Sequence, residues 1–513
     1  MLDLSPIAQA ALSLEERIRA TKGLFLPWAK PDKVVQKRWE RWQYVCGDEK
    51  RFAHRLRWLG LQNRGFAYAV LGSKPVSVPL PSWTHILQQV CQYEVGEEDA
   101  AYLPATPVPF AHLCLPFLAV ARQQLRLHDR WSVVAAPAVM EVLIQQLLAW
   151  LVNLAGRAFL EQFSLFRLAK QPMLARLMLH MPDYHSDQLY QEFVAQQRQD
   201  KLQSFFRTYP VLARLMCRVT ELWIEATQEF SDRLVADYDL LQEKFGVTGR
   251  VEKVQPELGD PHNGGRTVTG IEFSNGGRVI YKPRSLRAEQ AFAVWVDWVN
   301  SLGGTLDLQA AKTIDRGDYG WMEFIAAAPC RDREQVGRYY QRLGQLLTLL
   351  HILGANDCHG ENIIAQGEYP VLVDLETILN HEFRDTSPPG LRETNEALRQ
   401  TQEFLSKSVI RIGLLPRWEG SGDKTLDLSG MGIGEQPQVV QVPKWEDINT
   451  DKMRVTQVPM AIKQETASPK MGEETADPTQ FIEEFLTGFQ QAWQTIAQHK
   501  EQAPLAVLQD LKV

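Results

Sequence analysis

The residues with the clearest capacity for chemistry lie between Asp357 and Glu376. Asp357 is followed five positions later by Asn362, and the short apolar segment after it ends at Asp374. In phosphoryl transfer an aspartate orients or deprotonates the attacking hydroxyl, and oxygen ligands hold the Mg²⁺ ions that bridge the phosphates of ATP. Asp357 suits the first task, and Asn362 and Asp374 suit the second. The spacing therefore predicts a site for ATP-dependent phosphoryl transfer.

The histidine within this stretch has more than one interpretation. Asp357, His359 and Asn362 form the pattern Asp-x-His-x-x-Asn, and Asp-Leu-Glu begins at Asp374. This order is more similar to that of phosphoinositide kinases than to the His-Arg-Asp and Asp-Phe-Gly motifs of protein kinases. His359 is a candidate catalytic residue, or a structural residue that bonds the backbone of its own loop. Cys358 and His359 could also bind zinc, but zinc needs at least a third protein ligand and none is tied to this loop.

A lysine on a strand is the second part that such a site requires. Two alternating segments, 267–273 and 279–282, flank an Asn-Gly pair, which is a strong signal for a hairpin turn. The second strand would deliver Lys282 to a cleft ahead of the aspartate cluster, which is the order found in kinases. Glu289 follows seven residues later in an expected helix, where it could pair with Lys282 or be a solvated surface residue.

Two more polar segments flank these parts. The segment 320–324 leaves the last expected strand where a hinge to a second lobe belongs, and Glu323 is there a candidate nucleotide contact. The loop 259–266 precedes the hairpin where a nucleotide-covering loop would lie, and its paired glycines could expose N–H groups to phosphate. Asp260 and His262 in this loop are able to do chemistry, or the loop is a turn with an Asx-type hydrogen bond.

Hydrophobic periodicity changes from helical to strand-like at Gly246. The sequence predicts an α+β fold, in which a large helical N-terminal region precedes a bilobal kinase-like core resembling lipid kinases, with an irregular insertion. Strands are expected at 251–254, 267–273, 279–282, 306–313 and 321–325, and helices at 286–302, 334–353 and 480–500. The expected regions are a helical scaffold at 1–245, an N-lobe at 246–325, the catalytic part of a C-lobe at 326–383, the insertion at 384–475, and truncated C-lobe helices at 476–513.

Composition and charge exclude several classes of protein. The 513 residues carry a net charge of −7, so nucleic acid is not an expected partner. Six scattered cysteines without a Cys-x-x-Cys pair indicate reduced thiols and a cytoplasmic location. The first twenty residues lack the pattern of a signal peptide. The apolar run 133–159 contains Glu141 and Asn153, so we expect a buried helix and no integral membrane segment.

Longer strings surround the candidate residues. They read Gly-Asp-x-His before the hairpin, Val-Ile-Tyr-Lys-Pro-Arg-Ser-Leu, Gly-Trp-Met-Glu-Phe-Ile, Asp-x-His-x-Glu-Asn-Ile-Ile-Ala and Pro-Val-Leu-Val-Asp-Leu-Glu-Thr, with later matches at 408–416, 427–430 and 450–453. Through these strings the chain resembles the N-terminal dehydratase half of class II lanthionine synthetases, the LanM type. The similarity covers most of the chain.

The resemblance implies a phosphorylating dehydratase of lanthipeptide, or lantibiotic, biosynthesis. Such enzymes bind a precursor peptide through its leader, phosphorylate its Ser or Thr side chains with ATP, and then eliminate phosphate to leave dehydroalanine or dehydrobutyrine. The helical first half would include the leader-binding surface, and 384–475 would be an activation region. The implied roles are ATP phosphate contact for Lys282, activation of the hydroxyl for Asp357, magnesium binding for Asn362 and Asp374 with help from Glu376, catalysis for His359, and elimination for Asp260 and His262.

Two departures from the family pattern limit what we expect of this chain. The zinc-dependent cyclase half is absent, and the sequence stops about where an Arg-x-x-x-Arg-x-Thr-like segment tied to elimination should begin. We therefore expect phosphorylation to exceed dehydration, and a separate cyclase or a completing chain is a candidate partner. A kinase acting on another substrate remains an alternative, as does a remnant that binds precursor peptide or a partner subunit without catalysis.

Overall fold

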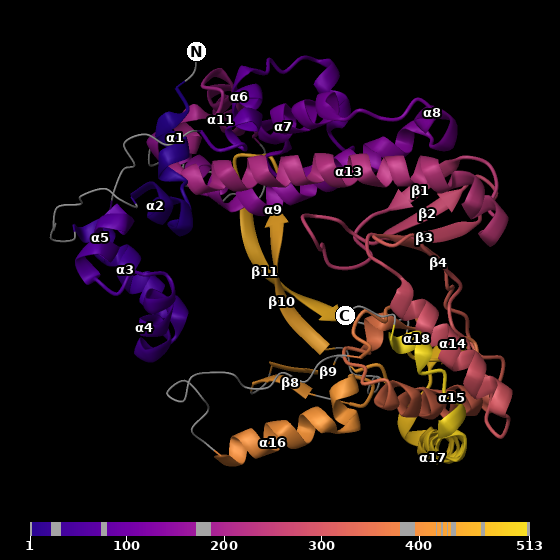
Figure 1. Cartoon of the computed structure of the whole chain (residues 1–513). Coiled ribbons are helices and arrows are strands. Elements are labelled where there is room, and N and C mark those ends of the chain that lie inside the picture. The colour runs from indigo at the N-terminus through magenta and orange to yellow at the C-terminus, as the bar shows by residue number, and fades with distance from the viewer. Residues whose placement is uncertain are drawn as a thin grey trace.

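Helices of the first half of the chain form a layer over one small sheet, and a second group of helices lies below that sheet (Figure 1). The protein therefore mixes helices and strands, as the expected α+β class requires. This computed structural model describes residues 3–21, 32–72, 80–170, 186–379, 396–416, 418–421, 424–427, 429–431, 438–462 and 467–509.

The first half is helical, as its sequence periodicity predicts. The helices between Leu14 and Gly72 pack around a small aromatic cluster of their own, in which the ring centroids of Trp39 and Phe52 lie 4.9 Å apart. The helices are α1 (Ser5–Ala10), α2 (Leu14–Thr21), α3 (Lys33–Cys46), α4 (Glu49–Trp58), α5 (Arg64–Gly72), α6 (Thr84–Gln92), the 3-10 helix η1 (Glu98–Tyr102), α7 (Ala111–Gln124), α8 (Trp131–Val134), α9 (Pro137–Lys170), α11 (Gln188–Gln199), α12 (Gln203–Thr208) and α13 (Pro210–Phe245).

The long helices α9 and α13 form the floor of this layer. Within the part of the chain that the structure describes, α9 is the one helix long and apolar enough to cross a membrane by length and composition. Of its most apolar window, 56% is buried inside the protein, and α9 packs on α7 and α13. From Pro137 onward the apolar run at 133–159 thus lies in a core helix, as expected.

The sheet has five antiparallel strands in the order β1-β2-β3-β5-β4. One face packs against α13: the rings of Phe230 and Tyr281 lie 5.1 Å apart, and Trp321 Nε1 donates to Asp237 Oδ2 over 2.8 Å. Because side chains alternate between the two faces of a strand, Lys282 of β3 points to the face opposite Tyr281, as expected from the sequence. The bounds are β1 (Val251–Gln255), β2 (Thr269–Phe273), β3 (Arg278–Lys282), β4 (Thr313–Asp315) and β5 (Gly320–Glu323).

The strand expected at 306–313 is wrong for most of its length, because β4 begins only at Thr313. Near Asp307 and Leu308 the backbone bonds to side chains, and contact with the neighbouring strand β5 begins at Lys312. Asn300 Nδ2 donates to the Leu308 carbonyl over 3.0 Å, and Asn300 Oδ1 accepts from the Leu308 N–H over 2.9 Å. Arg342 Nε donates to the carbonyl of Asp307 over 2.7 Å. Asn300 lies eight positions from Leu308 and Arg342 lies 35 positions from Asp307, so neither contact is part of a strand's alternation.

A second core joins the helices of the lower half. Two of them, α15 and α17, meet through their backbones: a Cβ added to Gly344 would lie 2.0 Å from the Phe485 carbonyl oxygen, and one added to Gly488 would lie 1.8 Å from that of Gln341. The elements are α14 (Arg287–Leu302), α15 (Arg333–Ile352), η2 (Gly360–Asn362), β6 (Ile363–Gln366), β7 (Tyr369–Leu372), α16 (Glu396–Lys407), η3 (Val409–Ile412), η4 (Pro478–Phe481), α17 (Ile482–Gln498), η5 (Lys500–Gln502) and α18 (Ala506–Gln509).

The expected irregular insertion is only partly irregular. It includes β8 (Trp418–Ser421), β9 (Lys424–Asp427), β12 (Lys470–Met471), β13 (Glu474–Thr475) and a ribbon of two nine-residue strands, β10 (Gln438–Glu446) and β11 (Arg454–Ile462). The ribbon spans from the lower half to the helical layer (Figure 1). At its tip Asn449 accepts from the Phe110 N–H over 3.1 Å, and Asp451 accepts from the Tyr190 N–H over 3.0 Å. A proline in each strand concealed the ribbon; both strands are edges, where proline is tolerated.

Candidate active site

One cavity of about 960 Å³ lies between the lower face of the sheet and the loop that follows α15. Strands β3 and β5, the turn after β7 and the loop before β2 all contribute to its wall. Of the site residues expected from the sequence, Glu289 lies behind this wall and the others line it: Asp260, His262, Lys282, Glu323, Asp357, His359, Asn362, Asp374 and Glu376. Residues up to 116 positions apart, from Asp260 to Glu376, thus share one space.

Lys282 reaches this space from the end of β3 and is only 3% exposed. Its Nζ donates to the Val373 carbonyl, lies 3.4 Å from Asp374 Oδ2 and lies 3.7 Å from Glu289 Oε1. Burial lowers the pKa of Lys282 below its ordinary range, although the charge of Asp374 opposes that shift. The expected pairing with Glu289 is therefore present, but it is the longer of the two ion pairs of this lysine.

The turn after β7 presents two carboxylates. The Glu376 N–H donates to Asp374 Oδ1 over 3.2 Å, which fixes the turn. Burial acts to raise the pKa of Asp374, but the charges of Lys282 and Arg284 outweigh it and hold the pKa below its ordinary value. Asp374 is therefore an anion at neutral pH, and Glu376 extends beside it with a side chain that is 41% exposed.

The loop between α15 and β6 holds Asp357 in an unusual backbone conformation. Its φ is +60°, in the left-handed region, where a non-glycine residue is uncommon and often marks a functional site. Its carboxylate is 60% exposed. Asn362 Nδ2 donates to the Asp357 carbonyl over 2.8 Å, and the Val373 N–H donates to the Asn362 carbonyl over 2.9 Å. The loop is thus tied to the turn that carries Asp374.

His359 both bonds the backbone of its own loop and lines the cavity, which are the two alternatives that the sequence left open. Its Nδ1 accepts from the Glu361 N–H over 3.3 Å, which is the structural alternative. Its Nε2 lies 3.6 Å from Asp357 Oδ1 at the wall of the cavity. The neighbouring Cys358 is 1% exposed, and burial raises the pKa of its thiol to about 12. That thiol is therefore protonated at neutral pH.

The carboxylate of Glu323 is engaged with the backbone. Its Oε1 accepts from the Lys312 N–H over 2.6 Å, and the Glu323 N–H donates to the Lys312 carbonyl over 2.9 Å. These two bonds hold the segment before β4 against β5. Glu323 lines the cavity, but its Oε1 is already bonded to the Lys312 backbone.

The loop that carries Asp260 and His262 is closed by its own backbone. The N–H groups of His262 and Arg266 each donate to the carbonyl of the other, over 2.9 and 3.0 Å. Between them Gly265 has a φ of +88°, and a Cβ there would lie 3.3 Å from the ring of Trp150 in α9. Both requirements explain the glycine, and the tight loop keeps the two candidate catalytic residues at the cavity.

The same loop is anchored to the helical layer. Arg266 Nε lies 2.5 Å from Glu229 Oε2 in α13, and Glu229 also pairs with Arg233. Arg233 Nη1 in turn donates to the Tyr281 hydroxyl over 2.7 Å, one residue before Lys282 in β3. The helix α13 thus supports both the loop and the strand that line the cavity. Spacing alone gave no signal for these contacts.

Arg284 is the residue whose importance the sequence did not reveal. Its guanidinium contacts Glu289, Asp374 and Glu376 together, two residues after the lysine. Burial acts to lower the pKa of Arg284, but these carboxylates, Glu289 foremost, outweigh it and raise the pKa. The Lys-Pro-Arg string is the only sequence signal for this contact.

The oxygen donors in the cavity fit magnesium. Asn362 gives its Nδ2 to the loop, so its Oδ1 remains for a ligand, and Asp374 and Glu376 supply carboxylate oxygens. Mg²⁺ prefers such oxygens and usually keeps water or substrate phosphate as further ligands. Among the described residues no group of three or more His, Cys, Asp or Glu side chains could hold a metal ion by itself. The residues therefore fit a magnesium ion that phosphate oxygens help to bind.

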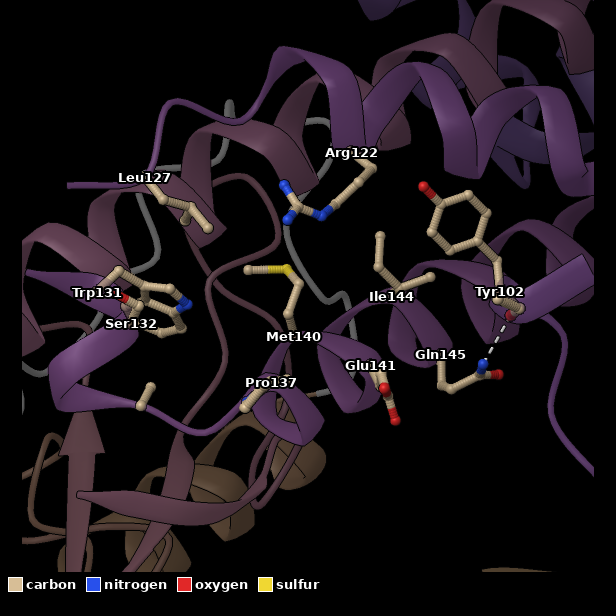
Figure 2. A pocket seen from close by; sticks show the side chains of 12 residues that line it. Tyr102, Arg122, Leu127, Trp131, Ser132, Pro137, Met140, Glu141, Ile144 and Gln145 are labelled. Carbon is tan, nitrogen blue, oxygen red and sulfur yellow. Dashed lines mark hydrogen bonds between the residues drawn. The ribbon is translucent and has the colours of Figure 1, made fainter. Parts of the chain in front are cut away.

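A second cavity of about 370 Å³ lies in the helical layer, away from these residues (Figure 2). Its floor is apolar, with Met140 and Ile144 of α9 and the ring of Trp131. Arg122 and Tyr102 border it, and Gln145 Nε2 donates to the Tyr102 carbonyl over 2.7 Å. None of the candidate site residues lies there, so it does not belong to the site described above.

Comparison with known proteins assigns the chain to a family. Residues 209–513 match the model of the domain of unknown function DUF4135. The chain belongs to this family. All residues that line the 960 Å³ cavity fall inside the DUF4135 segment, and so does α13, which supports the cavity from above.

The chain is also similar to a protein of Lactococcus lactis subsp. lactis, the lacticin 481/lactococcin biosynthesis protein LcnDR2. The two are 28% identical over 284 residues, which is 52% of this chain and 29% of the relative. The chain thus spans less than a third of the length of that protein.

Proposed function

We propose that this chain acts in lanthipeptide biosynthesis, where it uses ATP and Mg²⁺ to phosphorylate Ser and Thr side chains of a precursor peptide. The observation that carries the proposal is the single cavity that unites Lys282, Asp357, Asn362 and Asp374. The similarity to a protein named for lacticin 481 biosynthesis supports the choice of pathway. The sheet and the lower helices on either side of the cavity would be the two lobes of a kinase-like core.

Each wall of the cavity has a part in the proposed transfer. The exposed carboxylate of Asp357 would accept a hydrogen bond from the substrate hydroxyl and orient it toward the γ-phosphate. Lys282 would neutralise phosphate charge, because its ammonium is buried at the cavity wall. Asn362, Asp374 and Glu376 would hold the magnesium, which supplies charge neutralisation when bound. His359 would help to orient the Asp357 carboxylate, because its Nε2 lies 3.6 Å from Asp357 Oδ1.

The loop with Asp260 and His262 supports a second step in the same space. Elimination removes a proton from Cα of the phosphorylated residue and releases phosphate, so it needs a base near the phosphorylated side chain. Asp260 and His262 line the cavity with Asp357, and a phosphorylated residue would not have to leave it. We place elimination with these two residues.

The partners follow from the chemistry. A precursor peptide with a leader would be the substrate. The six free cysteines of this chain and the supply of ATP favour the cytoplasm. Ring closure needs a thiol addition step, for which a separate cyclase or a completing chain would serve.

Mass spectrometry of a leader-bearing precursor after incubation with the chain, ATP and Mg²⁺ tests the proposal. A gain of one phosphate at a Ser or Thr supports phosphorylation, and a loss of one water shows that elimination also occurs. An unchanged precursor that still binds the chain would contradict catalysis and favour a peptide-binding role. Phosphorylation of unrelated peptides at the same rate would contradict the assignment of the substrate.

A further inference from the structure

The guanidinium of Arg284 joins three carboxylates that come from α14 and from the turn after β7. Its Nη1 and Nη2 contact the two carboxylate oxygens of Glu289 over 3.1 and 2.6 Å. Its Nη2 also lies 2.6 Å from Asp374 Oδ1, and its Nε lies 3.3 Å from Glu376 Oε2. The planar fork of an arginine suits such simultaneous contacts, whereas the ammonium of a lysine acts as a point charge.

Arg284, and not Lys282, is the near partner of Glu289. The lysine Nζ is 3.7 Å from Glu289 Oε1, while the arginine binds the same oxygen over 2.6 Å. Glu289 is 4% exposed and needs a counter-ion, because a buried unpaired carboxylate is costly. Since Arg284 meets that need, Lys282 is not required to neutralise Glu289.

The position of Arg284 sets which carboxylate oxygens are left for the cavity. It takes Oδ1 of Asp374 and Oε2 of Glu376, so a cation in the cavity would meet Oε1 of Glu376 and Oδ2 of Asp374. The latter oxygen lies 3.4 Å from Lys282 Nζ, so a cation there would share it with the lysine. Asp374 and Glu376 line the cavity, whereas Arg284 and Glu289 stand behind them. The five charged groups sum to −1, with three carboxylates against two cations.

We propose that Arg284 is a positioning residue for the metal–nucleotide complex. Its fork aligns Asp374 and Glu376 as metal ligands. Its pairing with Glu289 leaves Lys282 beside Asp374, 3.4 Å from Oδ2, where the lysine would contact the phosphates that the metal bridges. The inference rests on the proposed function, because it assigns a supporting residue to the same cavity. It predicts that changing Arg284 lowers the extra affinity for nucleotide that a bound metal ion provides.

The test compares binding of the non-hydrolysable ATP analogue AMP-PNP with and without Mn²⁺, by calorimetry. In Arg284→Lys the charge remains but the fork is lost, and we expect the Mn²⁺-dependent gain in affinity to fall about tenfold or more, as for other residues that orient metal ligands. Arg287→Lys is the matched control. That arginine is near in sequence, is 55% exposed and pairs with Asp315 over 3.6 Å, so its substitution should leave the gain unchanged.

A purely structural role would change a different quantity. It would lower the unfolding temperature and weaken AMP-PNP binding equally with and without Mn²⁺. The double variant Arg284→Met/Glu289→Gln removes the buried charge together with its partner, so we expect it to fold and still to lack the Mn²⁺-dependent gain. A full gain in either folded variant would overturn the inference. If the wild-type chain binds no AMP-PNP, the proposed function fails and this inference fails with it.

Discussion

The Nε2 of His359 lies 3.6 Å from Oδ1 of Asp357, which is too far for a good hydrogen bond. The imidazole is held instead by the Glu361 N–H at its Nδ1, over 3.3 Å. The Asp357 carboxylate therefore remains open to the cavity and 60% exposed, although its backbone is fixed in the left-handed region. This arrangement leaves the carboxylate free for a substrate hydroxyl.

Asp357→Asn should abolish most of the phosphoryl transfer without unfolding the protein. Asparagine tolerates the left-handed conformation, and the carboxylate is exposed, so we expect the free energy of unfolding to change by less than about 0.5 kcal/mol. The rate of phosphate incorporation, measured by mass spectrometry, should fall by about 10² to 10⁴ because the group that accepts the proton is lost. Near-full activity of the variant would remove Asp357 from its assigned role.

Arg266→Gln should loosen the loop that carries Asp260 and His262. The variant loses the ion pair with Glu229. The side chains of Arg266 and Glu229 are each about one quarter exposed. We expect the global stability to fall by about 1 kcal/mol or less, while amide hydrogen exchange at 259–265 becomes faster. Arg250→Gln, at an exposed pair with Glu252 just before β1, is the control and should leave that exchange unchanged. Equal protection of the loop in both variants would show that Arg266 is not its anchor.

Gly344→Ala should destabilise the lower half, because the new Cβ would lie 2.0 Å from a carbonyl oxygen of α17. The two helix backbones must separate, at a cost of about 3 kcal/mol or more. Gly337 lies in the same helix, but its added Cβ would meet only the Glu484 side chain at 3.6 Å. Gly337→Ala should therefore stabilise the protein by about 0.5–1 kcal/mol through helix propensity. Urea unfolding of both variants measures the difference, and effects of the same sign would refute the close crossing.

Glu368→Gln should show a pH-dependent loss of stability. Burial acts to raise the pKa of Glu368, but hydrogen bonds from Arg338 and Arg342 outweigh it and hold the pKa below its ordinary value. A carboxyl with a lowered pKa contributes stability above its unfolded-state pKa and loses it as pH falls through the folded-state pKa. At neutral pH we expect a deficit of about 1.5–3 kcal/mol in the variant, because a charge-assisted bond to the buried Arg342 is weakened.

Unfolding by urea at several pH values measures this deficit, which should shrink below about pH 4.3, the ordinary pKa of glutamate. Glu334→Gln is the control, because Glu334 is 89% exposed and lies 3.9 Å from Arg338. A deficit for Glu368→Gln that stays constant down to the acid range would contradict the lowered pKa.

Local spacing was sufficient for much of the fold. Ser13 and Glu16, which have the spacing of a capping box at the start of α2, bond to each other, with the Ser13 N–H donating to Glu16 over 2.7 Å. The hairpin of β2 and β3 follows from an Asn-Gly turn, and α15 is followed by Gly354, whose φ is +62°. In each case the deciding interactions join residues only a few positions apart. The same reasoning placed Lys282, Asp357, Asn362 and Asp374 on neighbouring turns and strands, and the structure brings them to one cavity.

Contacts between distant segments decided what the sequence left open. Arg342 bonds to the Asp307 carbonyl, 35 positions away, in the segment that was expected to be a strand, and the β10–β11 ribbon is docked through Asp451 on the helical layer. Glu289 has two candidate cations, and only packing places Arg284 nearer to it than Lys282. The sequence by itself determined the order of elements and the chemical types at the cavity, because these depend on residue identity and spacing. The tertiary structure decided which charges meet, because the pairing of buried groups depends on distances that no local pattern encodes.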